Sequence, residues 1–338
     1  MKINNPSKLL ALLATASIAA TASFAQVTSD VVGYVTTTIT EGYNAIGSTF
    51  VKEADFSGSV TSASTNTLTL SASPSLDTAS NAYYIEVTSS SADLVGERID
   101  VASVSDNVVT LNTSADHNTI DDVSSFPAGT TVVIRAHFTV GDLNTLLGDS
   151  VNSDDNFTAA TSDQILFFEN GAFRSHIEYL GVWYQNFGSF SVVTDKVIAP
   201  GSGFFYYRNP GAGTPSDISF TFSGSVRSNN FAQELNTGYQ FVSTGYPIGA
   251  TPLELQLNDN LQASSNFVAS ESDLILTWDK TTQSFRTHIL YDNSGTKEWY
   301  QNYGSFAKVD STQLIEDDSA ALVLVRGSGQ VLEIPRLY

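Results

Sequence analysis

One nine-residue phrase is written twice in this chain. It reads "VWYQNFGSF" at residues 182–190 and "EWYQNYGSF" at residues 298–306. It closes a longer match, "DQILFFENGAFRSHIEYLGVWYQNFGSF" from Asp163 and "DLILTWDKTTQSFRTHILYDNSGTKEWYQNYGSF" from Asp273. The two copies differ in length only at two turns, where insertions are tolerated. The repeat therefore predicts a duplicated module of roughly 100 residues, a common domain size.

The rest of the chain consists largely of short runs in which side-chain character alternates with the two-residue period of β-strands. Runs such as "NAYYIEVTS", "TTVVIRAHF", "GFFYYR" and "ALVLVR" are strand-length, rich in β-branched and aromatic residues, and bounded by turn-forming residues. Two short helices are expected, near residues 143–147 and near residues 253–261. In the second, Thr251 would cap the helix and Pro252 would take its first position.

A second, smaller repeat lies in the first half of the chain. "VTSASTNTLTL" (residues 60–70) and "VASVSDNVVTL" (residues 101–111) align without gaps. They predict two related hairpins inside a small β-barrel-like insert at about residues 61–135. Its expected core contains Leu68, Leu70, Tyr84, Ile85, Val109 and Leu111.

The predicted fold is therefore all-β, with two homologous β-sandwich-like modules in tandem and a small β-barrel-like insert in the first. The first module would span residues 26–226 and the second residues 227–338. Residues 137–208 and 245–326 are expected to share one β-topology. Trp183 and Trp299 should take equivalent buried places, because each alternates with polar neighbours on a strand.

Residues 1–25 have the order of a secretory signal peptide rather than of a core helix. Lys2 and Lys8 precede an apolar run at residues 9–20, and Ser23 and Ala25 stand at the −3 and −1 positions of a cleavage site. We therefore expect export to the extracellular space, the cell surface or the periplasm. No later run approaches 18 apolar residues, so we do not expect a membrane-spanning chain.

Charge and cysteine content narrow the function classes. The chain has 15 basic and 35 acidic residues, and two of the basic residues lie in the predicted signal peptide. Such a negative protein repels nucleic acid, which is not an expected partner. The absence of cysteine excludes thiol catalysis and cysteine-based metal sites.

Two sets of repeated residues are candidate binding groups. Arg174 and His176 alternate with apolar residues and are expected to face away from the core, as a site for an anion or a sugar or as a structural cross-strand contact. The duplication favours the structural interpretation, since residues that repeats share usually encode packing. The phrase adds Tyr184 and Asn186 as sugar-binding candidates, because aromatic faces stack on sugar rings and amides bind hydroxyls. In the second copy the equivalent residues are Arg286, His288, Tyr300 and Asn302.

Metal and cofactor signals are sparse. Asp154 and Asp155, in "NSDDN", are the best candidates for Ca²⁺, although a solvated loop is the simpler interpretation. The four histidines (117, 137, 176 and 288) include no pair spaced for a metal on one local element. Known catalytic motifs are absent, and no other cofactor is expected.

Several segments together resemble a family of exported, β-rich bacterial proteins, many of them paralogous within one genome. The most specific marks are "YYIEV" leading to Gly96-Glu97-Arg98, and "PGSGFF" at residues 200–205. The second module departs from the pattern, with "EDDSAALVLVR" in place of the Pro-Gly turn. The resemblance covers most of the chain and implies export and a repeated β-rich fold; it implies no activity.

These observations favour an exported, non-catalytic protein, a structural or binding component of the cell surface, the matrix or the periplasm. Its candidate partners are polysaccharides or other surface proteins. One alternative is a secreted enzyme that acts on extracellular polysaccharide, because two catalytic carboxylates can be far apart in sequence. Another alternative is a carbohydrate-binding module.

Overall fold

The computed structural model describes residues 32–153, 156–210 and 216–338. The predicted signal peptide and the candidate calcium ligands Asp154 and Asp155 lie outside these residues. The chain is almost all β: 47% of it is strand, arranged in several sheets, and 5% is helix. This confirms the predicted all-β class. Among the described residues, none of the helices has the length and apolar character needed to cross a membrane.

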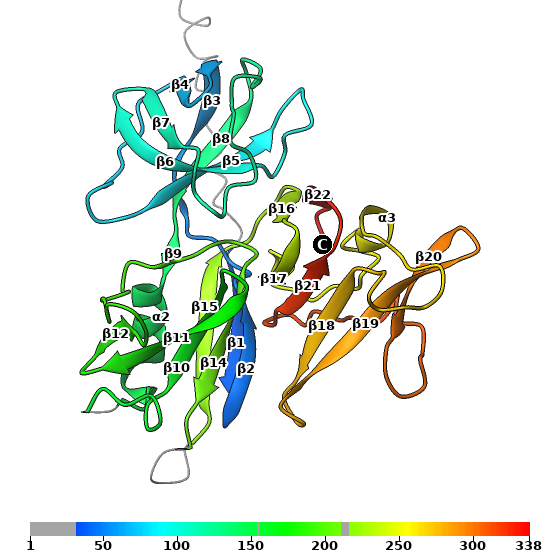
Figure 1. The fold of residues 1–338 in the computed structure, drawn as a ribbon. Helices are drawn as coiled ribbons and strands as arrows, with labels where there is room; N and C mark the ends of the chain where they lie inside the picture. Colours follow the sequence, from blue (N-terminus) through cyan, green and yellow to red (C-terminus); the bar gives the residue numbers. More distant parts are fainter. Residues whose placement is uncertain (1–31, 154–155, 211–215) are drawn as a thin grey trace, which may run out of the picture. The chain divides into compact units, whose positions relative to one another are not determined.

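Six strands close into a barrel in the order β3-β4-β7-β6-β5-β8 (Figure 1). Strand β3 begins at Ala54, before the expected boundary near residue 61, because residues 56–59 pair with residues 131–134 of β8. The barrel strands are β3 (Ala54–Ser64), β4 (Thr67–Leu70), β5 (Tyr83–Ser89), β6 (Arg98–Ser105), β7 (Val108–Asn112) and β8 (Thr131–Ala136).

The barrel core contains the expected residues with one exception. Leu68, Leu70, Ile85, Val109 and Leu111 are all buried in one cluster. Tyr84 was expected there, but Tyr83 joins the cluster instead. Successive side chains of β5 point to opposite faces, so Tyr84 lies on the outer face of the barrel.

The first five-stranded sheet has the order β12-β11-β10-β14-β2. Its strands are β2 (Gly42–Gly47), β10 (Gln164–Glu169), β11 (Ala172–Tyr179), β12 (Val182–Gln185) and β14 (Gly203–Arg208). One face packs in a common core with β1 (Val32–Ile39), β15 (Ile218–Ser225) and α2 (Val140–Leu147). The short elements β9 (Phe138–Thr139), η1 (Gly148–Ser150) and β13 (Val197–Ile198) flank this core.

Helix α2 forms where it was expected. Thr139 caps it through a capping box: the Thr139 hydroxyl accepts from the Asp142 amide at 3.2 Å, and the Asp142 carboxylate accepts from the Thr139 amide at 2.8 Å. Val140, Leu143 and Leu147 are buried against the first sheet.

The second five-stranded sheet has the order β17-β21-β18-β19-β20. Its strands are β17 (Gly238–Val242), β18 (Leu274–Asp279), β19 (Ser284–Asn293), β20 (Thr296–Gln301) and β21 (Ala321–Val325). Beside it, β16 (Phe231–Leu235) pairs with β22 (Gln330–Ile334).

The second predicted helix is shorter than expected. Thr251 forms its cap contacts with Glu254, but α3 covers only Leu257–Asn260. Gln256 has a φ of 57°, a left-handed conformation that an α-helix cannot contain. The segment before Gln256 therefore forms turns instead of continuing the helix.

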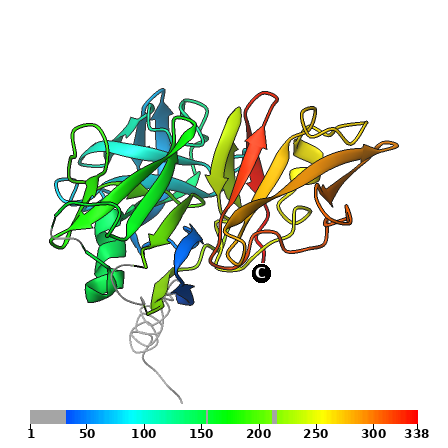
Figure 2. The same cartoon turned by 60° about the horizontal axis from the view of Figure 1, so that its bottom comes forward.

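Figure 2 shows the two sheets from a second direction. Read from β2 and from β17, both sheets have the same order, and in each the fourth strand, β11 or β19, lies between the strands that precede and follow it in the sequence. Phe205 of β14 stacks on Phe241 of β17, with ring centroids 4.9 Å apart, in an apolar cluster drawn from both sheets. Trp183 is 1% exposed and Trp299 0%, which confirms that both tryptophans belong to cores.

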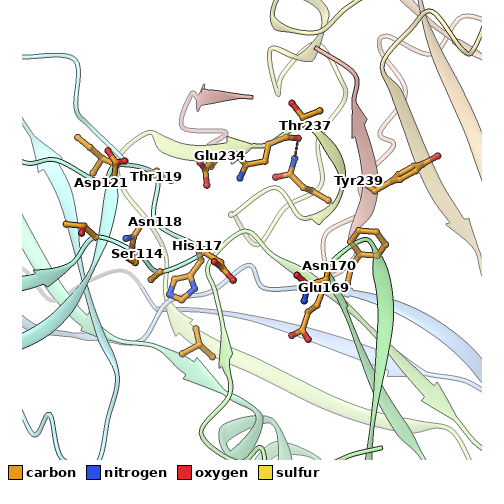
Figure 3. A pocket seen from close by; sticks show the side chains of 18 of the residues that line it. Ser114, His117, Asn118, Thr119, Asp121, Glu169, Asn170, Glu234, Thr237 and Tyr239 are labelled. Carbon is orange, nitrogen blue, oxygen red and sulfur yellow. Dashed lines mark hydrogen bonds between the residues drawn. The ribbon is translucent and has the colours of Figure 1, made fainter. Parts of the chain in front are cut away.

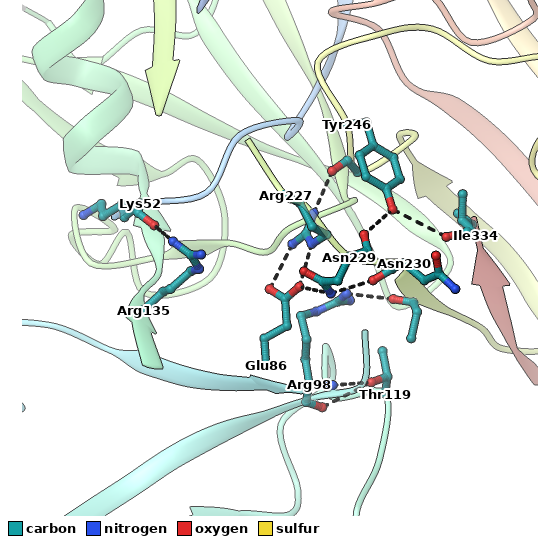
Figure 4. Close-up of polar contacts among 12 residues, drawn as sticks. Lys52, Glu86, Arg98, Thr119, Arg135, Arg227, Asn229, Asn230, Tyr246 and Ile334 are labelled. Atoms are coloured by element: carbon teal, nitrogen blue, oxygen red, sulfur yellow. Dashed lines mark hydrogen bonds and ion pairs between the residues drawn. The ribbon is translucent and has the colours of Figure 1, made fainter. Parts of the chain in front are cut away.

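The outer face of the barrel carries buried charges that contact residues 227–232 (Figure 4). Arg98 donates to the carbonyl of Ala232 at 2.7 Å, and its guanidinium lies 4.3 Å from the ring centroid of Phe231. The guanidinium of Arg227 lies 4.4 Å from the centroid of the same ring. A cation above an aromatic face is favourable, so one phenylalanine receives two such contacts.

Candidate functional site

The repeated arginine–histidine pairs lie beside the repeated phrase, and both members of each pair contact one aromatic ring of the phrase. His176 is 1% exposed, and its ring centroid lies 5.6 Å from that of Phe187. The Arg174 guanidinium lies 5.5 Å from the same Phe187 ring. The second copy repeats this, with Tyr303 lying 5.7 Å from the ring of His288 and 5.2 Å from the guanidinium of Arg286.

The expected orientation of these histidines is wrong. His176 pairs with Gln185, so it lies on the same face of the sheet as Trp183, toward the core. The opposite face is also covered in part, by the cluster around Phe173 and Phe205. Both faces of this sheet have apolar partners. Alternation along the strand therefore does not predict which face His176 occupies.

Tyr184 lies in a cluster of aromatic residues at one end of the first sheet. The ring of Phe157 lies 5.3 Å from that of Tyr179, 5.3 Å from that of Tyr184 and 5.7 Å from that of Phe190, all edge to face. These four side chains, which we call the first aromatic cluster, line a shallow hollow of about 350 Å³. Phe190 is 52% exposed. The first aromatic cluster therefore offers an apolar surface to solvent.

Tyr300 lies in a matching group, the second aromatic cluster, formed by Phe267, Tyr291, Tyr300 and Phe306. Phe267 lies at the centre, with ring centroids 5.4, 5.6 and 5.8 Å from those of the other three, again edge to face. Phe306 is 53% exposed, almost the same fraction as Phe190. Sequence analysis identified only Tyr184 and Tyr300 in the two clusters. The phenylalanines come from loops whose positions the strand pattern does not predict.

The repeated phrase explains how the exposed phenylalanines are held. In the first copy the Phe190 amide donates to the carbonyl of Phe187 at 3.2 Å, which closes a turn. In the second copy the Phe306 amide donates to the carbonyl of Tyr303 at the same distance. Phe190 has a φ of 52° and Phe306 a φ of 54°, in the left-handed region that bulky residues seldom adopt. Such backbone strain costs roughly 1–3 kcal/mol and is concentrated at functional sites.

The predicted amides Asn186 and Asn302 anchor the same turns. The backbone amide of Asn186 donates to the carbonyl of Ser175 at 3.0 Å, and that of Asn302 donates to the carbonyl of Thr287 at 2.9 Å. The Asn186 side chain reaches the Ser175 hydroxyl at 3.4 Å. These bonds, most of them from the backbone, hold each turn against the neighbouring strand, β11 or β19.

The two clusters differ at their rims. Beside the first cluster stand Leu180 and Val192, 64% and 56% exposed. Beside the second, the Tyr300 hydroxyl donates to Glu298 at 2.7 Å, and Lys308 donates to the same carboxylate at 2.6 Å. The exposed rim residues of the first cluster are thus apolar, whereas the second cluster has a hydrogen-bonded carboxylate and lysine at its edge.

A larger, polar cavity of about 1030 Å³ lies elsewhere, between the barrel loop at residues 113–121 and segments of both sheets (Figure 3). Four carboxylates, one lysine and one histidine are among its lining groups. Burial and the nearby carboxylates of Asp121 and Asp116 raise the pKa of Glu234. The acidic groups are Asp116, Asp121, Glu169 and Glu234, with Lys196 paired to Glu169.

The histidine of this cavity, His117, belongs to a cluster that sequence analysis missed. Its Nε2 lies 2.8 Å from Oδ2 of Asp100, and Nε2 of His137 lies 2.8 Å from Oδ1 of the same carboxylate. Burial acts to raise the pKa of Asp100, but the two imidazoles outweigh it and hold the pKa at about 2. Two imidazoles and one carboxylate, with ligand atoms within 4.8 Å of one another, are a donor set for a metal ion.

Comparisons with family models, with curated proteins and with solved structures find no match for this chain.

Proposed function

We propose that this protein is an exported, non-catalytic binding component of the cell surface, the matrix or the periplasm, and that it binds polysaccharide through its two aromatic clusters. The observation that carries the proposal is the pair of clusters itself. Each sheet presents four aromatic rings in the same arrangement, with one half-exposed phenylalanine held in a left-handed conformation.

The chemistry of the clusters suits a saccharide. Aromatic residues with one exposed face stack on the apolar face of a sugar ring, and rigid rings lose little conformational entropy on binding. At the rim of the second cluster, Glu298, Tyr300 and Lys308 can hydrogen-bond hydroxyl groups. A polymer of repeating sugars can occupy two equivalent sites at once, and bivalent binding raises its affinity without any new contact.

We infer that the two sites arose by duplication of one β-module, with the barrel inserted into the first copy. Three observations support this. The sheets have the same strand order. Asp163 and Asp273 take equivalent buried places, where each carboxylate accepts two backbone amide hydrogen bonds. The barrel strands lie between β2 and α2 in the sequence, whereas β17 leads to α3 with no barrel between them.

Binding to insoluble polysaccharides tests the proposal. The full-length mature protein would be incubated with a panel of insoluble neutral and acidic polysaccharides, and depletion from the supernatant measured. At least one polymer should retain the wild-type protein, and F190A/F306A should stay in solution. The control is Y34A, which removes a 78% exposed tyrosine outside both clusters and should bind normally.

Thermal unfolding of each variant separates lost binding from lost structure. Both phenylalanines are half exposed, so their truncation should change stability by less than about 1 kcal/mol. Retention of F190A/F306A at the wild-type level would contradict the proposal.

The second candidate is an enzyme acting on extracellular polysaccharide, and the acidic cavity favours it. A raised carboxyl pKa, as at Glu234, is the property of a general acid in glycoside hydrolysis. Release of reducing ends from a polysaccharide, abolished by E234Q and retained in F190A/F306A, would establish this function in place of the first.

A further inference from the structure

Alternation along three barrel strands brings several polar side chains to one outer face. Strand β5 lies between β6 and β8, and Tyr84 of β5 pairs with Asp100 of β6 and with Arg135 of β8. Side chains alternate along each strand, so Asp100 and His137, which directly follows β8, share the outer face with Tyr84. Asp100 and His137 are 37 positions apart in the sequence, and the pairing of the strands brings them together.

His117 reaches the same carboxylate from the loop between β7 and β8. The residues after it fix the loop to β6. The Asn118 side-chain oxygen accepts from the Asp100 amide at 2.9 Å, and the Asn118 side-chain amide donates to the carbonyl of Asn112 at 2.7 Å. Thr119 exchanges backbone and hydroxyl hydrogen bonds with Arg98. His117 is therefore positioned by the loop's own contacts with the barrel.

We propose that Asp100, His117 and His137 bind one divalent transition-metal ion, for which Zn²⁺ is the best fit. In a tetrahedral zinc site with bonds of 2.0–2.2 Å, ligand atoms lie about 3.3 Å apart. The two nitrogen–oxygen distances are 2.8 Å, and all three ligand atoms lie within 4.8 Å of one another. The two nitrogen–oxygen distances would lengthen by about 0.5 Å to reach this tetrahedral spacing.

The donor set selects the class of ion. Ca²⁺ and Mg²⁺ bind mainly oxygen ligands, whereas imidazole nitrogens suit zinc, copper, nickel and iron. Two of the three donors are imidazoles, and the third is a carboxylate. Three protein ligands would leave a coordination position for water or another small ligand, as in catalytic zinc sites.

The surroundings admit and attract a cation. The His117 side chain is 29% exposed and lines the large cavity, while Asp100 and His137 behind it are 13% and 1% exposed. Asp116, Asp121, Glu169 and Glu234 line the same cavity and concentrate cations near its wall. His117 therefore connects the buried ligands to the space from which an ion enters.

The ring of His137 is oriented by packing. Its centroid lies 4.7 Å from that of Tyr84 and 4.9 Å from that of His117. Nδ1 of His137 has no hydrogen-bond partner among the described residues, so no second contact fixes its tautomer. Metal binding at Nε2 requires the tautomer that carries the proton on Nδ1, and this change of tautomer breaks no hydrogen bond at Nδ1.

Metal titration of the untagged mature protein tests the site. After treatment with a chelator, the protein would be titrated with Zn²⁺ by calorimetry and with Co²⁺ by visible absorption. We expect one Zn²⁺ per chain with a micromolar or tighter Kd, a rise in Tm with Zn²⁺, and a Co²⁺ spectrum typical of nitrogen and oxygen ligands. Ca²⁺ should not compete at equal concentration.

Two variants distinguish a metal site from a hydrogen-bonded structural triad. H117Q keeps a side-chain donor for Asp100 but lacks an imidazole, and it should lose Zn²⁺ affinity by about 100-fold or more while remaining folded. D100N should lose affinity similarly. H288Q, which changes a buried histidine in the second sheet, should bind as the wild type does. Absence of Zn²⁺ binding by the wild-type protein, or equal binding by H117Q, would overturn the proposal.

Discussion

Arg227 donates two hydrogen bonds to the carboxylate of Glu86, from Nε to Oε1 at 2.7 Å and from Nη2 to Oε2 at 3.3 Å. Both side chains are 2% exposed. Burial acts to raise the pKa of Glu86, but the charge and hydrogen bonds of Arg227 outweigh it and keep the pKa below its usual value. This ion pair joins barrel strand β5 to the chain that leads into the second sheet.

Replacing Glu86 by Gln should destabilise the protein strongly. The change leaves the Arg227 guanidinium buried without a counter-charge, which typically costs about 3–5 kcal/mol. Urea unfolding would measure the loss. The control is K308A, which removes a lysine whose 50% exposed side chain pairs with Glu298 and Asp310, and it should cost no more than about 1 kcal/mol. Equal effects of E86Q and K308A would show that the buried pair does not hold the barrel in place.

The two buried tryptophans should respond differently to the same substitution. Nε1 of Trp183 donates to the side-chain oxygen of Asn144 at 2.8 Å, whereas Nε1 of Trp299 is buried with no partner among the described residues. W183F therefore loses a hydrogen bond, while W299F removes an unpaired donor. W299F should cost less than W183F by about 1–3 kcal/mol, measured by denaturant unfolding. The opposite order would refute this difference between the two cores.

His288 should make the protein less stable in mild acid. Burial lowers its pKa from 6.5 to about 4, so the unfolded chain takes up a proton at a higher pH than the folded chain does. Stability should therefore fall as the pH drops from about 6.5 to about 4, by roughly 3 kcal/mol, and this contribution stays lost below that range.

The variant H288Q should lack this part of the pH dependence. The difference between its unfolding free energy and that of the wild type should change between pH 7 and pH 4, in favour of the variant at low pH. A difference that is constant with pH would contradict the assignment. H176Q should show a change of the same sign, because burial also lowers the pKa of His176.

The features that the sequence predicted well are those that depend on local alternation. The all-β class, helix α2 and the burial of Trp183 and Trp299 follow from patterns within single segments. The orientation of His176 and of Tyr84 could not be obtained in this way. Both lie on strands with buried groups on both faces, so polarity did not distinguish the inner side from the outer.

The clusters that could bind ligands depend on contacts between distant segments. Asp100 is 17 positions from His117 and 37 from His137, and only the closure of the barrel brings them together. Phe157 and Phe267 join their clusters from loops before the central strands. Their recurrence just ahead of the matching Asp163 and Asp273 was the available signal, since "NF" precedes each aspartate by the same interval.

Counting saccharide sites by calorimetry tests the central claim most directly. A soluble oligosaccharide cut from the polymer that retains the protein would be titrated into the wild type, F190A, F306A and the double variant. If each aromatic cluster is one site, the number of sites should fall from two to one in either single variant and to none in the double variant. The remaining site should keep its Kd, while affinity for the polymer falls by about 100-fold or more in each single variant. Two sites in all four proteins, or none in the wild type, would contradict the account.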